Sequence, residues 1–236
     1  MRIDLNADVG ESSGQDPLLI PSITSANVAC GVHAGGPDVM RDTLALARHF
    51  NVAVGAHPGF PDREGFGRRD LHLSAREIED LVARQIEALA ILAAEAGMRL
   101  QHVKPHGALF NMAVRDRSVA DPIARAIAGI DRSLILFGLP QSELIAAGTA
   151  AGLPTAREAF ADRAYRPDGT LVPRSEPGAV IHDPEAVLAR VVAMARDPNV
   201  DTICVHGDTP GAAVLASRIS RALVDAGIQL MAVGLP

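Results

Sequence analysis

The stretch DLNADVGES, residues 4–12, alternates between apolar and polar side chains and carries three hydrogen-bonding groups on one side. With the two-residue period of a β-strand, successive side chains point to opposite faces. The polar face consists of Asp4, Asn6 and Asp8, and the apolar face consists of Ile3, Leu5, Ala7 and Val9. Burying two carboxylates and an amide costs free energy unless they find partners. The stretch therefore predicts a strand whose polar face meets such partners inside the fold.

Strand-like and helix-like segments alternate along the rest of the chain. The expected strands are residues 2–8, 23–30, 52–57, 99–104, 133–139, 154–160, 201–206 and 228–233. The expected helices are residues 37–50, 74–96, 117–129, 141–151, 183–196 and 210–226. Repeated β/α units predict a mostly parallel sheet, either closed as a barrel or open with helices on both faces. Because no linker or fixed repeat interrupts the pattern, we expect a single domain over residues 1–236.

The composition limits the class of protein and its partners. The chain of 236 residues is 48% hydrophobic and 21% charged, and its net charge of −6 argues against nucleic acid or an anionic membrane as a partner. No apolar run approaches the roughly 18 residues that span a bilayer. The N-terminus lacks the apolar region of a secretory signal, and the two cysteines show no CxxC spacing. We therefore expect a cytoplasmic protein with reduced thiols.

Residues 160–182 break the alternation of strands and helices. This segment is rich in Pro, Gly and Arg, contains a PDGT turn signal at residues 167–170, and holds the only tyrosine, Tyr165. Loops of this length within a compact domain are usually functional or disordered. We expect an ordered lid over the site.

Polar side chains gather where the expected strands end. In parallel α/β folds the ligand site lies at the carboxyl ends of the strands, so these groups converge on one place. Five strand ends contribute, and their convergence is the main indication of an enzyme. The residues are Asp8 and Glu11; Asn27 and His33; His57, Asp62 and Arg68; His102, Lys104 and His106; and His206 and Asp208.

The residue types indicate proton transfer at a small acidic substrate. Of the 22 basic residues only Lys104 is a lysine, which suggests that a compact ammonium is needed there. There is no Walker loop, no G-x-S-x-G elbow and no H-E-x-x-H pair. Carboxylates, histidines and one ammonium suit hydrolysis of a C–N bond. These residues could also bind a divalent metal, but their spacing does not specify one. Glu11 and Asp62 also fit as caps of helices or turns.

Six long motifs occur in a fixed order along the chain. They are DLNADVGES, SANVACGVHAGG, GAHPGFPDREGFGR, HVKPHGALFN, FADRAY followed by DGTLVPRS, and TICVHGD. In this order they resemble the LamB/YcsF family, the A subunits of bacterial ATP-dependent 5-oxoprolinase. The resemblance covers nearly the whole chain. It implies a seven-stranded β/α barrel similar to those of glycoside hydrolases and polysaccharide deacetylases.

The resemblance also implies a reaction and partners. The family opens the lactam of 5-oxo-L-proline to L-glutamate with ATP hydrolysis, and two further subunits, B and C, complete the enzyme. Because this chain has no recognisable nucleotide loop, we expect ATP to be handled mainly by those subunits. One departure is Gly36, where the family commonly has an acidic residue that could bind a ligand or cap a helix.

Within such a barrel the polar face of residues 4–8 points inward, with Asp4 as a structural group at the bottom. We expect catalysis from Asp8, Lys104, His106 and His206. Lys104, with Arg68, holds carboxylate or phosphoryl oxygens, while Asp8 and a histidine activate water and another histidine protonates the leaving nitrogen. Substrate binding is expected from Asn6, Glu11, Asn27, His33, His57, Asp62, Arg68, His102 and Asp208.

Two other functions remain open at this point. The first is a metal-dependent deacetylase or amidohydrolase that acts alone in the same kind of barrel. The second is a non-catalytic subunit that binds 5-oxoproline or serves as a scaffold for subunits B and C. The scaffold ranks last, because gathering charged groups at five strand ends without chemistry would be costly.

Overall fold

Strand β1, Arg2–Val9, closes the sheet because it pairs with a strand on each side. In this computed structural model, which describes residues 1–206 and 211–234, β1 runs parallel to β2, Ser25–Ala29, and to β7, Thr202–Val205. The register places Asp8 opposite Asn27 on one side and Asn6 opposite Cys204 on the other. The ring β1-β2-β3-β4-β5-β6-β7 is therefore a closed parallel barrel, which confirms the seven-stranded prediction.

The remaining strands follow the expected positions within a few residues. They are β3, Ala53–His57; β4, Leu100–Val103; β5, Ile135–Gly138; and β6, Thr155–Phe160. The expected strand at residues 228–233 shortens to β8, Gln229–Leu230, which pairs only with the first residues of β1 and stays outside the ring. It is short because β7 takes over as the partner of β1 from Asp4 onward.

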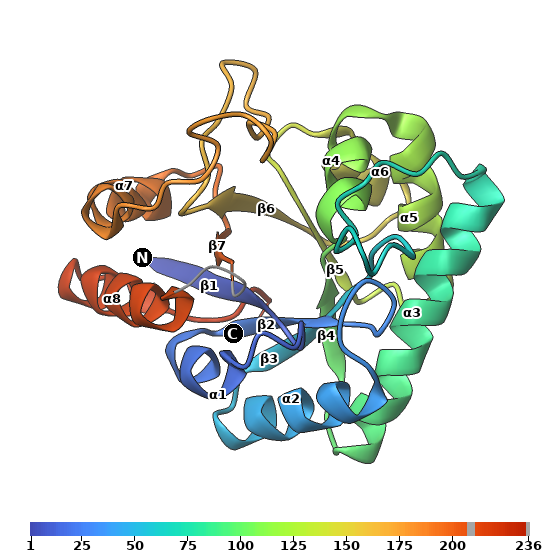
Figure 1. Ribbon diagram of the computed structural model, residues 1–236, viewed down its shortest axis with the longest axis horizontal. Helices are drawn as coiled ribbons and strands as arrows, with labels where there is room; N and C mark the ends of the chain where they lie inside the picture. The colour runs from blue at the N-terminus through green and yellow to red at the C-terminus, as the bar shows by residue number, and fades with distance from the viewer. Residues whose placement is uncertain (207–210, 235–236) are drawn as a thin grey trace.

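Helices follow the strands and surround the barrel (Figure 1). Six of them match the sequence prediction: α2, Pro37–His49; α3, Ala75–Glu95; α5, Arg117–Ile130; α6, Glu143–Ala150; α7, Pro184–Arg196; and α8, Ala212–Asp225. The capping box expected at Ser74 and Glu77 is present at the start of α3. Three short elements were not predicted: α1, Asp16–Leu19; the 3-10 turn η1, Ile20–Ser22; and α4, Gly107–Arg115. The first two have four and three residues, too few for a periodic pattern. Helix α4 begins at Gly107 without a side-chain cap to mark its start.

The two faces of β1 meet different surroundings. Leu5 and Ala7 are fully buried and belong to the hydrophobic core. Asp4, Asn6 and Asp8 are also buried, and their hydrogen bonds run to other strands of the ring. The polar face therefore points inward and the apolar face packs outward, as the alternation predicted.

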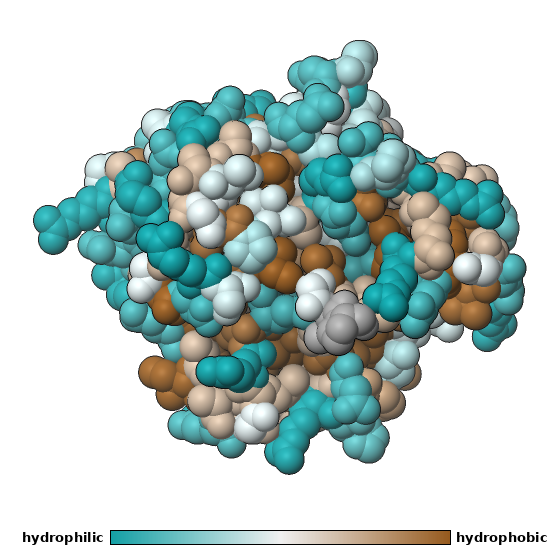
Figure 2. Space-filling view, turned by 180° about the vertical axis from the view of Figure 1, so that it is seen from behind, coloured by the Kyte–Doolittle hydropathy of each residue, from teal (hydrophilic) through white to brown (hydrophobic). Residues whose placement is uncertain are grey.

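On one face of the molecule, hydrophobic side chains show between hydrophilic ones near the centre (Figure 2). Figure 2 shows hydrophilic side chains around most of the periphery of one face of the molecule. None of the helices in residues 1–206 and 211–234 is long and apolar enough to cross a bilayer.

The expected lid segment extends beyond the barrel between β6 and α7, at the top of Figure 1. Two isolated antiparallel bridges, Arg163 with Val180 and Tyr165 with Leu171, tie it together. Arg163 donates hydrogen bonds to the carbonyls of Ala179 and Val172, at 3.1 and 2.6 Å. The segment is therefore held in one conformation by β-bridges and hydrogen bonds between its own residues.

Candidate active site

The bottom of the barrel interior holds one carboxylate surrounded by hydroxyls. Thr24 and Ser25 donate hydrogen bonds to Oδ1 of Asp4 at 2.6 and 2.7 Å, and Thr202 donates to Oδ2 at 2.5 Å. Burial outweighs these hydrogen bonds and raises the pKa of Asp4 to about 6. We call Asp4, Thr24, Ser25 and Thr202 the floor network. All its side-chain oxygens have partners within the network, which fits the structural role expected for Asp4.

The next layer links amides, a histidine and a second buried acid. Asn6 donates to Glu158 at 3.0 Å, Asn27 donates to Asn6 at 2.7 Å, and His102 lies 2.8 Å from the amide oxygen of Asn27. The His102 ring crosses the barrel above Gly55, where a Cβ would lie 2.2 Å from the ring. Glycine at this position therefore lets the layer form. Burial lowers the pKa of His102 to about 3, so its ring is neutral.

Lys104 occupies the centre of the barrel with all three ammonium donors engaged. Its Nζ lies 2.9 Å from Asp8, 3.0 Å from Glu158 and 2.9 Å from the Cys204 sulfur. Burial would lower the pKa of Lys104, but Asp8, Cys204 and Glu158 hold it well above its usual value. Burial would likewise raise the pKa of Asp8, but His57 and Lys104 hold it well below its usual value. The centre therefore contains a charged pair.

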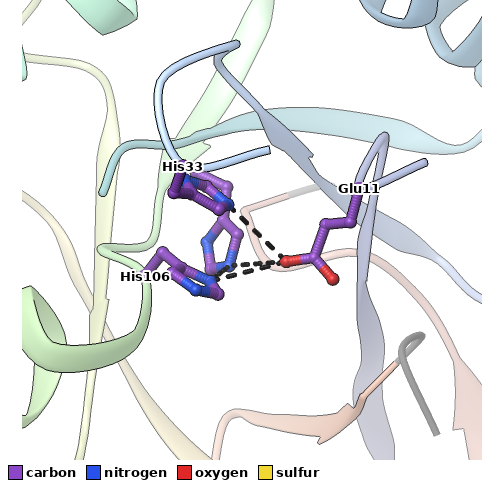
Figure 3. A group of neighbouring side chains, drawn as sticks. Glu11, His33 and His106 are labelled. Carbon is purple, nitrogen blue, oxygen red and sulfur yellow. Dashed lines mark hydrogen bonds and ion pairs between the residues drawn. The ribbon is translucent and has the colours of Figure 1, made fainter. Parts of the chain in front are cut away.

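At the upper end of the barrel three histidine rings surround one carboxylate oxygen. Oε1 of Glu11 lies 3.7 Å from Nε2 of His33, 3.9 Å from Nε2 of His57 and 3.4 Å from Nδ1 of His106. Figure 3 shows the Glu11 carboxylate facing the His33 and His106 rings. These two rings stack with centroids 3.9 Å apart. We call Glu11, His33, His57 and His106 the rim cluster.

A second histidine arrangement lies across the site from the rim cluster. Nδ1 of His206 lies 2.9 and 3.1 Å from the two carboxylate oxygens of Asp162. Because a carboxylate only accepts, Nδ1 carries a proton, and Nε2 is the ring nitrogen not used by Asp162. Burial would raise the pKa of Asp162, but His206 lowers it below its usual value. This pair has the form of a general base held by an acid.

A cavity of about 680 Å³ opens above these groups. Its floor includes Asp8, Glu11, His57, Lys104, His106 and His206. Its walls include five arginines: Arg68, Arg115, Arg163, Arg166 and Arg174. Three of the five come from the expected lid segment. The cavity thus combines acid–base groups at its base with cationic walls that suit an anionic ligand.

Five residues predicted to bind substrate lie behind the cavity lining. Asn6, Asn27 and His102 form the buried layer beneath Asp8, and His33 lies behind His106. Asp62 instead holds its own loop, since its carboxylate accepts a hydrogen bond from the backbone of Gly65 at 2.9 Å. The positions of these five residues suit support rather than contact with substrate. Asp208 lies outside the described residues.

Lys104, expected to hold substrate oxygens, reaches the cavity floor, and that role stays a prediction. Its three donors already point at Asp8, Glu158 and Cys204, and its side chain is 2% exposed. The position of Lys104 suits control of the charge on Asp8. Arg68, by contrast, lines the cavity, with its guanidinium 4.9 Å from the Phe66 ring centroid.

Sequence reasoning missed Glu158 and Asp162. Glu158 is a fully buried acid in the apolar strand β6, and burial raises its pKa. A partial signal was available, because Glu158 shares the two-residue period of Ala156 and Phe160 in TAREAF, just as the polar groups of residues 4–8 share one face. Asp162 follows the end of the same strand but was assigned to the lid. Cys204 is fully buried in the core, and its sulfur also lies 2.9 Å from the Lys104 ammonium.

Gly36, where the family commonly has an acid, begins helix α2 without a side-chain cap. A Cβ at this position would meet nothing within 4 Å. An acidic side chain here would therefore have room at a helix N-terminus, which favours the capping explanation over a lost ligand.

Comparisons with known proteins agree with this geometry. A family model described as the LamB/YcsF family matches residues 3–234. A protein from Tolumonas auensis, named as the A subunit of 5-oxoprolinase, is 48% identical over 248 residues, covering 98% of this chain and 99% of that protein. A solved structure of a lactam utilization protein from Thermus thermophilus has a TM-score of 0.92 at 42% identity, covering 98% and 100% of the two chains.

More distant structures share the architecture. A peptidoglycan deacetylase from Bacillus subtilis has a TM-score of 0.52 at 15% identity, covering 98% of this chain and 87% of that one. At this identity the likeness shows the fold alone, and it confirms the expectation of a deacetylase-like barrel.

Proposed function

This chain belongs to the LamB/YcsF family, and on that premise we propose that it opens the lactam of 5-oxo-L-proline to L-glutamate, coupled to ATP hydrolysis. Two comparisons support the proposal: the 48% identical relative named as a 5-oxoprolinase component, and the similar structure named as a lactam utilization protein. The relative's name designates one part of a multi-subunit enzyme. We therefore assign ATP handling mainly to partner subunits B and C.

One observation carries the proposal: the cavity places a poised histidine–carboxylate pair opposite cationic walls. His206 and Asp162 supply the base, while Arg68 and Arg174 line the same cavity. Arginine recognises carboxylate and phosphate oxygens with paired hydrogen bonds. 5-Oxo-L-proline carries a carboxylate, and its O-phosphorylated form carries more negative charge. The cavity suits both forms.

The chemistry requires activation, because a lactam carbonyl is a poor electrophile. Transfer of the ATP terminal phosphoryl group to the lactam oxygen gives ADP and an activated ring. Addition of water to the ring carbon and cleavage of the C–N bond leave an acyl phosphate, with the electron pair and a proton on nitrogen. A second water releases phosphate and gives L-glutamate. In sum, one lactam, one ATP and two waters give one L-glutamate, one ADP and one phosphate.

The residues of this chain then take distinct roles. Nε2 of His206 removes a proton from water, and Asp162 holds the ring and stabilises its positive charge. Asp8, kept ionised by Lys104, lies 3.5 Å from Nε2 of His57 and places a negative charge at the base of the cavity. The His206 ring, protonated by that water, returns the proton to the leaving nitrogen. No residue in this scheme binds the nucleotide.

The segment 160–182 serves as a lid in this proposal. It carries Arg163, Arg166 and Arg174 along the cavity wall, so substrate binding and lid position are linked. The internal bridges described above keep the arginines in place. An ordered lid of this kind excludes water from the activated ring.

The test uses the chain assembled with its partner subunits. Glutamate and ADP are measured for the wild type, His206→Gln and the exposed-site control His72→Gln, and assembly is followed by size-exclusion chromatography. We expect the glutamate yield of His206→Gln to fall by about 10²–10⁴-fold with assembly intact, while the control is unchanged. Unchanged turnover in His206→Gln would favour the scaffold. Full ATP-coupled ring opening by this chain alone would contradict the division of labour.

A second candidate function is favoured by one observation. The rim cluster places one carboxylate and three imidazoles together, a donor set typical of metal-dependent hydrolases. Such an enzyme would hydrolyse a small amide without partners or ATP. Assaying the isolated chain on 5-oxo-L-proline and on simple amides, with no nucleotide present, separates the two functions.

A further inference from the structure

The four rim-cluster residues each direct one donor atom to a common point. These atoms are Oε1 of Glu11, Nε2 of His33, Nε2 of His57 and Nδ1 of His106, and all lie within 4.8 Å of one another. All four residues are buried. Such convergence of buried donors needs a physical reason, because lone pairs that face one another repel.

Backbone carbonyls fix the tautomers of two of the rings. Nδ1 of His57 lies 2.7 Å from the carbonyl of Lys104, and Nε2 of His106 lies 2.8 Å from the carbonyl of Phe66. A carbonyl oxygen only accepts, so each of these nitrogens carries the proton. In the neutral rings the opposite nitrogens are bare, and they face each other at 2.9 Å. Either a shared proton or a cation must lie between them.

The surroundings of His33 favour a bound cation over a shared proton. Neither of its ring nitrogens has a hydrogen-bond partner within the described residues, although the residue is 1% exposed. Two glycines make room for the ring: a Cβ on Gly59 would lie 2.6 Å from Nδ1 of His33, and one on Gly67 would lie 2.9 Å from its Cβ. A proton shared by His57 and His106 leaves this third buried ring without a partner, whereas an ion at the common point engages it.

The spacing also suits an ion. Four ligands about 2.0–2.1 Å from a metal lie about 3.4 Å from one another in a tetrahedron. Four of the six separations between donor atoms are 2.9, 3.4, 3.7 and 3.9 Å, and all six are within 4.8 Å. The four donors therefore reach coordination range when the stacked His33 and His106 rings tilt so that both lone pairs point at one ion. The carbonyls behind His57 and His106 act as the outer partners that ligating histidines usually have.

A neighbouring group of donors does not offer the same opportunity. Asp8, Cys204 and His206 also lie close together, but the Lys104 ammonium contacts both Asp8 and Cys204 at 2.9 Å. A cation of the protein itself thus already neutralises that group. The contrast locates the metal site in the rim cluster.

We propose that Glu11, His33, His57 and His106 bind one divalent transition-metal ion of the zinc class. Three imidazoles and a carboxylate are borderline ligands that suit zinc, cobalt, nickel or iron rather than magnesium or calcium. When bound, such an ion would supply Lewis acidity at the cavity floor and ease deprotonation of water. Asp8, 3.5 Å from His57, balances the added positive charge. The inference stands on the donor geometry and does not depend on the identity of the substrate.

The test is a metal titration of the full chain, which needs neither substrate nor partner subunits. The protein is stripped with a chelator and titrated with Co²⁺, followed by visible absorption, and Zn²⁺ content after dialysis is measured by elemental analysis. We expect one ion per chain and a change in the Co²⁺ spectrum that reports nitrogen ligation. We expect Glu11→Gln and His33→Leu each to weaken binding at least tenfold, and His72→Gln to bind like the wild type.

Folding of each variant is checked by circular dichroism and thermal unfolding. Two ligand variants are used so that one still tests the site if the other does not fold. Binding of less than one ion per chain by the folded wild type would overturn the metal site and leave a proton shared by His57 and His106. The metal site would also be overturned if both ligand variants folded and bound the ion as tightly as the wild type. If the metal site holds but the reconstituted enzyme makes no glutamate, the proposed function fails and the metal site remains.

Discussion

The floor network and the rim cluster lie at opposite ends of the same barrel and treat their polar groups differently. At the floor, Asp4 accepts hydrogen bonds from three hydroxyls, and the group is complete without a ligand. At the rim, ring nitrogens of His57 and His106 face each other at 2.9 Å, and His33 has no hydrogen-bond partner among the described residues. Burial alone therefore does not identify a functional site. An incomplete set of partners does.

The two ends differ in this way because they are built from different types of side chain. The floor pairs one acceptor with Ser and Thr hydroxyls, which rotate to donate wherever a donor is needed. The rim uses imidazoles, whose two nitrogens are fixed by ring geometry and, in His57 and His106, by one backbone carbonyl each. Rings held in this way cannot satisfy one another. Four predictions test the contrast, beginning with the side chain that lies between the two ends.

The largest effect is expected at Lys104. Lys104→Met keeps the length of the side chain but leaves the Asp8 and Glu158 carboxylates buried without their cation. We expect the free energy of unfolding to fall by about 3–5 kcal/mol, because removing one partner of a buried ion pair leaves an uncompensated charge. Urea unfolding followed by circular dichroism measures the change. A loss below about 1 kcal/mol would show that the centre carries no charged pair.

The next largest effect is a pH dependence from the floor. The pKa of Asp4 is raised from 3.8 to about 6 in the fold, so the folded state binds the proton more tightly than the unfolded state. Its contribution to stability is therefore full below about pH 4 and is lost as pH rises to about 6, a difference of about 3 kcal/mol. Asp4→Asn should lack this slope.

The measurement for Asp4 is the free energy of unfolding of both proteins, stripped of metal, at several pH values between about 4 and 7. The free energy of unfolding of the wild type minus that of the variant should decline as pH rises over that window and level off above it. A difference that rises with pH would instead mean that Asp4 is held ionised by its three hydroxyl partners.

A smaller effect is expected from one hydroxyl of the floor. Thr202→Val keeps the shape but removes the group that donates to Asp4 at 2.5 Å and accepts from Asn6 at 2.7 Å. We expect a loss of about 1–3 kcal/mol in the free energy of unfolding, because two buried polar atoms lose a partner. Thr202→Ser, which keeps the hydroxyl, serves as the matched variant and should recover part of the loss.

The smallest effect is expected at the rim. His33→Leu in the metal-free protein removes a buried ring whose nitrogens make no hydrogen bond within the described residues. We expect the free energy of unfolding to change by less than about 1 kcal/mol, since a polar group without partners contributes little. Thermal unfolding after chelation measures this. A loss as large as that of Thr202→Val would remove the distinction between floor and rim.

Much of the fold could be read from the local pattern. The alternation in residues 4–8 correctly separated the inward face from the outward face, and the strand positions agree within a few residues. Helices with clear caps, such as α3 after Ser74, were also found. Helix α4 was not, because it begins at Gly107 without a side-chain cap to mark its start. Closure of the barrel came from family resemblance, since β/α alternation fits a closed or an open sheet.

The candidate site was predicted only in outline. Convergence at the strand ends correctly gathered Asp8, His57 and His106, because parallel strands bring their carboxyl ends together. Depth could not be predicted: Lys104 proved to be engaged by its neighbours, and Asp62 proved to hold a loop. Glu158 and Asp162 were missed because each acquires its meaning from a partner that is distant in sequence.

The sequence by itself determined which side chains face inward, because the two-residue period of a strand leaves no other choice once the apolar face is buried. Only the tertiary structure decided which of those inward groups complete one another. Pairing β1 with both β2 and β7 fixes the register of the ring, and the register sets the distance from each donor to each acceptor. The same kinds of residue are thereby satisfied at the floor and left open at the rim.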